Sequence, residues 1–239
     1  MSQRSLLFSS FVALLSVGCM SPRGFDRAKM LDRLSGGIVV NDADIAETLK
    51  LRPQLEAGSK LGIHIRTPAF GRYGWDSATK KKLDELCASL VEYGTISTCR
   101  FVNLFESPSE KSGFIKTLRL AGARHGVDAV LLLDFASDYN LYSNPLAFTY
   151  PLLLTAFFVP GSTADGMCIS RGTLWDVRNG FLYMSAETEA TSSRTLPFAL
   201  LSPRNVELDS RRKSEDMLIS ELKGRLQTLV PNGIHRADR

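Results

Sequence analysis

The chain has 239 residues, of which 44% are hydrophobic, so it is long enough to bury a sizeable core. Its 29 Lys and Arg residues nearly balance its 25 Asp and Glu residues, and the net charge is +4. A nucleic-acid-binding domain would carry a basic stripe with interleaved aromatic side chains, and the sequence shows no such stripe, so we expect no nucleic acid as a partner.

The first 18 residues have the pattern of a secretory signal peptide. Arg4 supplies a positive charge, and an apolar stretch from Leu6 to Leu15 follows it. This stretch is shorter than the roughly 20 apolar residues that a helix needs to cross a bilayer, which favours a cleaved signal over a transmembrane anchor. We therefore expect residues 1–18 to be removed.

Cys19 follows directly, in the run Ser16-Val17-Gly18-Cys19. A small residue before a cysteine at this place resembles the lipobox of bacterial lipoproteins, although Ser16 stands where that pattern usually has Leu. The resemblance implies that Cys19 begins the mature protein and carries acyl chains such as palmitate, each buried CH₂ of which contributes about 0.8 kcal/mol to membrane binding. The alternative is an ordinary secretory signal followed by an unmodified cysteine.

The residue after Cys19 bears on location. It is Met20 rather than Asp, and by resemblance to enterobacterial lipoproteins this predicts an anchor in the outer membrane, with the protein facing the periplasm. Residues 19–58 combine scattered charges with Gly36-Gly37 and show no sustained hydrophobic period. They predict a lipidated cysteine on a flexible tether.

A single domain is expected at 59–230, before a polar tail at 231–239, and two strand–helix–strand passages open it. Strands are expected at 61–65, 96–105 and 128–135, with apolar residues at helical spacing between them. Gly94 and Gly126 stand where the two intervening helices would end. Helical crossovers imply neighbouring parallel strands, covered on both faces.

The second half of the domain predicts an antiparallel hairpin and a closing helix. Asn179-Gly180 lies between apolar runs at 173–177 and 181–184, which is the strongest short-range signal for a hairpin. A last helix at 210–230 places leucines on one stripe. The expected fold is α/β: one sandwich-like domain with a mixed sheet of about five strands, in the order β-α-β-α-β-β-β-α, and helices packed on it.

An uncharged apolar segment lies between Pro145 and Pro160. It is too short to span a membrane as a helix, so one interpretation is a loop that dips into a membrane or docks on a partner. The other, which the sequence favours, is a buried strand or helix under the sheet, because apolar runs of about 10–14 residues are more often core elements. The aromatic side chains available for a membrane or partner contact are Phe148, Tyr150, Phe157 and Phe158.

Three cysteines remain after Cys19. Cys87 lies on the sheet-facing stripe of the first helix and Cys99 on the next strand, so their side chains could meet as a disulfide, which an oxidising envelope permits. The alternative is that they stay as small buried thiols. The spacings of the cysteines and of the three histidines fit no zinc site, and we expect neither a metal nor another cofactor.

Two short motifs are similar to those of penicillin-binding enzymes. Ser77 to Lys80 matches S-x-x-K, and Ser137 to Asn140 is faintly like S-D-N. The third element, K-T-G, is absent, because Lys116 lies in a Lys-Thr-Leu run that also precedes the second motif. Helix capping accounts for Ser77. We therefore expect no enzymatic activity.

The second half of the chain resembles the rhombotarget lipoproteins of bacterial envelopes. In these an apolar segment ending in Val-Pro-Gly precedes a hairpin with a valine, an aspartate and a basic turn, as in Val159-Pro160-Gly161 and Asp176-Val177-Arg178. The similarity runs from about Leu61 to the final helix. More distantly, the element order is similar to that of TolB N-terminal domains and curli-secretion lipoproteins. These resemblances imply an envelope protein that binds partners rather than turning over a substrate.

Together these features predict a membrane-anchored lipoprotein that acts as a non-catalytic binding or assembly component of the cell envelope, with an envelope protein as its partner. Two alternatives stay open. One is an oligomeric secretion or pore accessory lipoprotein, and the other is an envelope hydrolase that uses the Ser77 to Lys80 motif.

Overall fold

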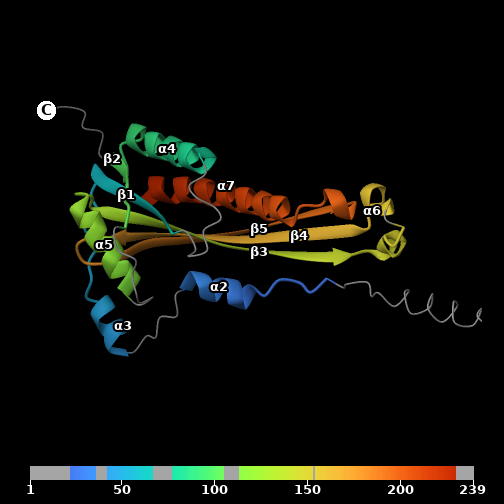
Figure 1. Cartoon of the computed structure of the whole chain (residues 1–239). Coiled ribbons are helices and arrows are strands. Elements are labelled where there is room, and N and C mark those ends of the chain that lie inside the picture. The colour runs from blue at the N-terminus through green and yellow to red at the C-terminus, as the bar shows by residue number, and fades with distance from the viewer. Residues whose placement is uncertain (1–21, 36–41, 67–76, 105–112, 153, 230–239) are drawn as a thin grey trace, which may run out of the picture. The chain divides into compact units, whose positions relative to one another are not determined.

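The computed structural model describes residues 22–35, 42–66, 77–104, 113–152 and 154–229 (Figure 1). Its strands form one mixed five-stranded sheet in the order β2-β1-β3-β4-β5, with helices packed on it, so the predicted α/β fold is confirmed. The elements are α2 (Arg27–Ser35), α3 (Asp42–Thr48), β1 (Ser59–Arg66), α4 (Ser77–Glu92), β2 (Ile96–Phe101), α5 (Phe114–Arg124), β3 (Ala129–Ser143), η2 (Pro145–Thr149), α6 (Thr155–Phe158), β4 (Ser162–Asp176), β5 (Leu182–Leu196), η3 (Phe198–Leu200) and α7 (Pro203–Leu229).

The described residues group into two compact units. The first, which we call the parallel-sheet unit, contains the described residues of the ranges 27–136, 169–189 and 213–229. The second, the extension unit, contains residues 137–168 and 190–212 together with the described residues 22–26. The strands β3, β4 and β5 and the helix α7 each contribute residues to both units.

The parallel-sheet unit is built from the two predicted crossovers. β1 pairs in parallel with β2 and with β3, which places Ile63 opposite Phe101 on one side and Leu131 on the other. The apolar run at the start of β3 is buried throughout, from Ala129 to Ala136, as expected for a strand covered on both faces. The two crossover helices end as predicted, before glycines with positive φ.

The predicted hairpin is present, but its strands are longer than expected. β4 and β5 each have 15 residues, and β3 continues to Ser143, past its predicted end at Phe135. The additional residues are rich in Ser, Thr and small side chains, whose hydrogen bonds to neighbouring elements do not appear in a hydrophobic pattern. In the extension unit, for example, the hydroxyls of Thr163 and Thr195 lie 2.9 Å apart.

Helix α7 packs closely on β4 in both units. In the extension unit, a Cβ atom on Gly166 would lie 2.6 Å from the carbonyl oxygen of Val206, so only glycine fits there. In the parallel-sheet unit, a Cβ atom on Gly172 would lie 2.9 Å from the Cδ2 atom of Leu222. The predicted leucine stripe of this helix is buried at positions 218, 222 and 226. The helix begins earlier than predicted, at Pro203, a residue suited to the first helical turn.

Part of the expected tether packs against the parallel-sheet unit. α2 buries Met30 and Leu34, and the Nη2 of Arg66 donates to the carbonyl oxygen of Leu34 at 3.0 Å. Further along, the Nδ2 of Asn179 donates to the carbonyl oxygen of Arg52 at 2.6 Å. The described residues of this stretch are therefore held by contacts. The signal peptide at 1–18, Cys19 and the tail at 231–239 lie outside the described residues.

A buried ion pair joins β1 to β3. The Nε of Arg66 lies 2.6 Å from the Oδ1 of Asp134, and its Nη2 lies 3.0 Å from the Oδ2. The guanidinium also stacks on the ring of Phe114, at 4.9 Å from the centroid. Asp134 is only 4% exposed, and this burial raises its pKa to about 6, although the charge of Arg66 opposes the shift.

The raised pKa of Asp134 predicts a pH-dependent stability. Between about pH 4 and pH 6 the folded state binds a proton that the unfolded state has released, so the free energy of unfolding falls as the pH rises through this window. We expect this contribution to decrease by about 1–3 kcal/mol across the window in the wild type and to be absent in Asp134→Asn. Urea titrations at intervals between pH 4 and pH 7 measure it.

The control for this experiment is Asp84→Asn, which changes an exposed carboxylate on α4. It is expected to retain the pH dependence of the wild type. If the free energy of unfolding changes with pH in the same way in the wild type and in Asp134→Asn, the prediction is contradicted.

The close packing at Gly166 predicts a second result. Gly166→Ala is expected to lower the free energy of unfolding by about 1–3 kcal/mol, because the new methyl group meets the backbone of α7. Gly224→Ala is the matched control, since its Cβ atom meets nothing within 4 Å, and replacing a helical glycine there stabilises by up to about 1 kcal/mol. Denaturant unfolding measures both, and equal effects would count against the packing described.

Candidate functional site

Large apolar side chains are exposed at the end of the extension unit where β3 stops and β4 begins. They lie on η2, on α6, on the residues between these helices, and on η3, which contacts α6. Their exposed fractions range from 47% to 78%. We call them the apolar tip: Leu146, Phe148, Leu152, Leu154, Phe157, Phe158, Phe198 and Leu200.

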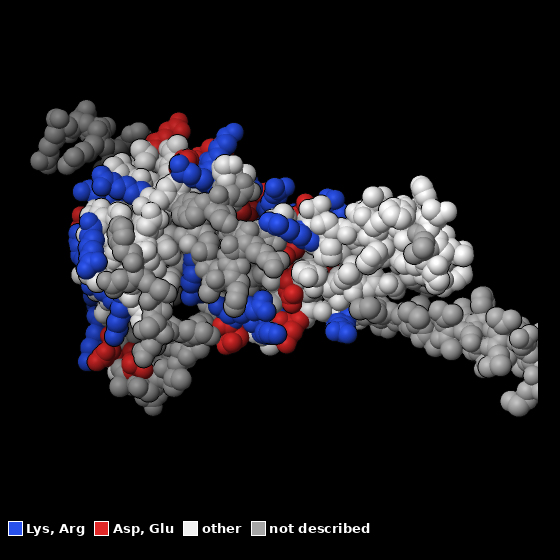
Figure 2. Space-filling view, viewed as in Figure 1, with Lys and Arg blue, Asp and Glu red and all other residues white. Residues whose placement is uncertain are grey.

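The apolar tip is surrounded by uncharged sequence. No Asp, Glu, Lys or Arg occurs in residues 139–164 or 195–203, which contain all of its side chains. Figure 2 shows the consequence, because the surface over α6 is white whereas blue and red side chains are spread over the rest of this face. Large exposed apolar patches are unusual on monomeric proteins, so the tip is the candidate functional surface of the described residues.

The prediction that Pro145 to Pro160 forms a buried strand or helix is wrong. Phe148, Phe157 and Phe158 are exposed, and Tyr150 is half-buried. The physical reason is the position of the segment in the fold. It begins after β3 has ended and finishes before β4 begins, so it has no sheet face of its own to cover.

Asn144 holds the two ends of this segment together. Its backbone N–H donates to the carbonyl oxygen of Gly161 at 2.9 Å, and its Nδ2 donates to that of Pro160 at 2.8 Å. Its Oδ1 accepts a hydrogen bond from the backbone N–H of Leu146 at 2.9 Å, which caps η2. One side chain therefore closes the loop and starts its first helical turn.

The centre of the segment is packed around Tyr150. Its hydroxyl lies 3.2 Å from the carbonyl oxygen of Val159 and 3.2 Å from the Oγ of Ser162, and its ring centroid lies 6.4 Å from that of Phe198. A Cβ atom on Gly161 would lie 2.7 Å from the Tyr150 hydroxyl, so the chain passes too close for a larger residue. The apolar tip is thus presented by a folded, hydrogen-bonded frame.

The sequence predicts three of the eight side chains of this surface. These are Phe148, Phe157 and Phe158, whereas the fourth candidate, Tyr150, supports the frame. Leu146, Leu152 and Leu154 belong to the same segment, but Phe198 and Leu200 were missed. A usable signal was the second uncharged run, residues 195–203, which contains two prolines and two exposed leucine or phenylalanine side chains.

Cys87 and Cys99 are joined by a disulfide in the parallel-sheet unit. Their sulfur atoms lie 2.04 Å apart and their Cα atoms 5.7 Å apart, and the bond links α4 to β2. Cys168 is a buried thiol on β4. Cys19, the predicted site of lipid attachment, lies outside the described residues.

The residues of the enzyme-like motifs lie in separate settings. Ser77 and Lys80 are exposed on the first turn of α4, and the Nζ of Lys80 lies 6.0 Å above the ring centroid of Phe101. Ser137 belongs to the extension unit, where its hydroxyl donates to the Oε1 of Glu207 at 2.5 Å. Ser77 and Ser137 therefore lie in different parts of the fold, one exposed on α4 and the other bonded to a residue of α7.

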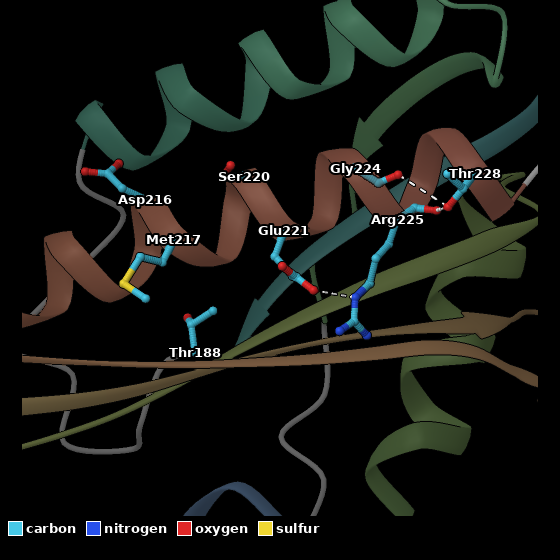
Figure 3. Close-up of a pocket in the computed structure, with 8 residues that line it drawn as sticks. All are labelled: Thr188, Asp216, Met217, Ser220, Glu221, Gly224, Arg225 and Thr228. Carbon is cyan, nitrogen blue, oxygen red and sulfur yellow. Dashed lines mark hydrogen bonds and ion pairs between the residues drawn. The ribbon is translucent and has the colours of Figure 1, made fainter.

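A depression of about 810 Å³ lies between α7 and β5 in the parallel-sheet unit (Figure 3). Its charged side chains are paired. The Nε of Arg225 lies 2.7 Å from the Oε1 of Glu221, and its Nη1 donates to the carbonyl oxygen of Ser185 at 2.6 Å. The Oδ1 of Asp216 lies 2.7 Å from the Nζ of Lys82. Each of the three charged side chains that line the depression is therefore already paired within the fold.

The histidines are dispersed. The Nδ1 of His64 lies 2.8 Å from the carbonyl oxygen of Val102, and burial lowers the pKa of its ring. His125 caps the end of α5, and His235 lies outside the described residues. In the part of the chain that the structure describes, no group of three His, Cys, Asp or Glu side chains is arranged to hold a metal, and no helix is long and apolar enough to cross a membrane.

The role of Asn144 predicts a local effect. Asn144→Ala removes two side-chain hydrogen bonds that close residues 145–160, and each contributes about 0.5–1.5 kcal/mol. We expect amide hydrogen exchange in this segment to accelerate about tenfold or more. Asn205→Ala, at an exposed position on α7 in the same unit, is the control and is expected to leave the exchange unchanged. Unaltered exchange in Asn144→Ala would contradict the frame described above.

Comparisons with known proteins identify no family. No protein-family model matches the chain, and no curated protein matches it. The resemblance to rhombotarget lipoproteins therefore stays a prediction.

Solved structures match the chain with low TM-scores. A minor lipoprotein from Acinetobacter baumannii has a TM-score of 0.36 and 13% identity over 72% of this chain and 92% of its own. The LpoB C-terminal domain from Salmonella enterica has a TM-score of 0.30 and 15% identity, and the match covers 56% of this chain and 83% of that domain. A PelC dodecamer from Paraburkholderia phytofirmans has a TM-score of 0.31 and 15% identity, and the match covers 73% of this chain and 93% of the PelC chain. TM-scores this low assign neither a fold family nor a function to the chain.

Proposed function

We propose that this chain is a bacterial lipoprotein, held to the outer membrane by acyl chains on Cys19, and that its domain faces the periplasm and acts by binding rather than by catalysis. The apolar tip is the observation that carries the binding role. The signal-like residues 1–18 and the lipobox-like run before Cys19 support the anchor.

The apolar tip is large enough to drive association. Burying one large apolar side chain contributes about 1.5–3 kcal/mol, so eight partly exposed ones contribute on the order of 10 kcal/mol when covered. This is comparable with the roughly 4–15 kcal/mol that association costs in lost freedom of motion. The cost is smaller for a protein that a lipid already holds at a membrane, because the second contact is then intramolecular.

The settings of the polar groups support binding over hydrolysis. Ser77 and Lys80 are exposed on the surface of a helix, whereas catalytic groups act in sites that exclude water. The hydroxyl of Ser137 is used in a contact with α7. By contrast, the apolar tip has an organised frame and exposed side chains that no described residue covers.

Metabolic labelling tests the anchor. In living cells, an alkyne analogue of palmitate is expected to label the wild type, and the label is expected to be lost in Cys19→Ser because the acceptor residue is gone. Cys168→Ser is the control and retains the label, since Cys168 is a buried thiol inside the domain. An unlabelled wild type would contradict the anchor and favour an ordinary secreted protein.

A second set of variants tests the binding role. A proximity-labelling enzyme fused to the chain reports its envelope neighbours. Ser77→Ala is expected to leave that profile unchanged, whereas Leu154→Ser with Phe158→Ser changes it, because the substituted side chains belong to the apolar tip. The reverse pattern would contradict the proposed binding role.

A further inference from the structure

A specific occupant of the apolar tip follows from its chemistry and its place in the chain. We infer that the apolar tip inserts into the hydrocarbon of the same membrane leaflet that holds the acyl chains of Cys19, so that the protein contacts the membrane at two points. The inference rests on the lipidation proposed above and adds to it a second, protein-made contact.

The side chains of the tip suit hydrocarbon. All eight are leucine or phenylalanine, and the two chain segments that carry them contain no charge, so insertion removes no ionised group from water. The side chains that contribute most of the energy of a protein interface are, in contrast, enriched in Trp, Tyr and Arg, and Leu is under-represented among them. No Trp or Arg lies in residues 139–164 or 195–203.

The polar groups of the tip are satisfied from within, as a lipid environment requires. Its hydroxyls bond to its own backbone: the Oγ1 of Thr149 donates to the carbonyl oxygen of Leu146 at 2.9 Å, and that of Thr155 donates to the carbonyl oxygen of Thr149 at 2.5 Å. Backbone N–H groups along the segment donate to carbonyl oxygens three or four residues earlier. These hydroxyl and backbone N–H groups therefore stay paired when the tip enters hydrocarbon.

The lipid is attached close to the unit that carries the tip. Residues 22–26 belong to the extension unit, as does the whole apolar tip. Cys19 precedes Pro22 by three positions, and an extended chain spans at most about 3.6 Å per residue, so the acylated cysteine lies within roughly 11 Å of Pro22. A link this short holds the extension unit at the bilayer and raises the effective concentration of lipid at the tip.

The dimensions of the tip determine the depth of insertion. η2, α6 and η3 have five, four and three residues, far fewer than the roughly 20 that a spanning helix needs. Short apolar elements of this kind enter about 5–10 Å, to the boundary between headgroups and acyl chains. The contact is therefore with one leaflet, the one reached by the lipid on Cys19.

Quenching by brominated lipids tests the inference. The acylated full-length mature protein, purified from cells, is placed in vesicles of phosphatidylethanolamine and phosphatidylglycerol whose acyl chains carry bromine. Phe158→Trp puts a probe at the most exposed position of the tip, and Leu49→Trp puts one at an equally exposed position in the parallel-sheet unit. The emission added by Trp at 158 is expected to shift to the blue and fall about twofold or more, as for an interfacial side chain, whereas that added at 49 is unchanged.

Each outcome decides the inference. If the protein is acylated and held on vesicles but the probe at 158 is not quenched, insertion is overturned while the lipoprotein proposal stands. If mass spectrometry finds no acyl chain on Cys19, the proposed anchor fails. In that case quenching at 158 after simple mixing with the vesicles still supports insertion by the tip, and its absence overturns it.

A photo-crosslinking amino acid at position 158 distinguishes the possible occupants in cells. Adducts with phospholipid support insertion. An adduct with another protein, or with a second copy of this chain, as the main product would overturn the inference and assign the tip to a protein interface. Incorporation at position 49 controls for nonspecific adducts, because that residue lies on the parallel-sheet unit.

Discussion

The close approach of α7 to β4 is the constraint on which the other features depend. Glycine at 166 and at 172 lets the helix lie against the strand, by backbone contact with Val206 in the extension unit and by the side chain of Leu222 in the parallel-sheet unit. A helix that lies this close leaves no room for a side chain at these two positions of the strand. The neighbouring strand β5 continues for 15 residues, although eight of them are Ser, Thr or Ala.

The parallel-sheet unit and the frame of the apolar tip use polar groups differently. In the parallel-sheet unit, charges are paired within the fold, as in the contact of Arg66 with Asp134 and Leu34, which joins two strands and α2. At the end of the extension unit, uncharged groups such as Asn144 and Tyr150 close the chain on itself. The polar groups of that frame bond to one another, and the exposed side chains of the tip are leucine and phenylalanine. Such a surface suits contact with an apolar environment, because burying it leaves no polar group unpaired.

This arrangement connects the proposed anchor with the proposed binding surface. A lipid on Cys19 would confine the protein to a membrane, and the apolar tip belongs to the unit that contains the first described residues after that cysteine. Two contacts would restrict the orientation of the extension unit as well as its location, because a single flexible attachment leaves rotation free. The charged side chains of the protein would stay in water, because ionised groups avoid hydrocarbon.

Local sequence was sufficient for the α/β class, the crossover helices and the hairpin turn, because these depend on hydrophobic period, capping glycines and turn residues within a few positions of each other. It was insufficient for the ends of β3, β4 and β5, whose hydroxyl-rich residues are stabilised by distant partners. Above all, only the tertiary structure decided that Pro145 to Pro160 is exposed. An apolar run has the same composition in a core and on a contact surface, and what distinguishes them is whether another element covers it. The same reason explains why Phe198, about 40 positions after Phe158 in the chain, was recognised as part of the tip only in the folded protein.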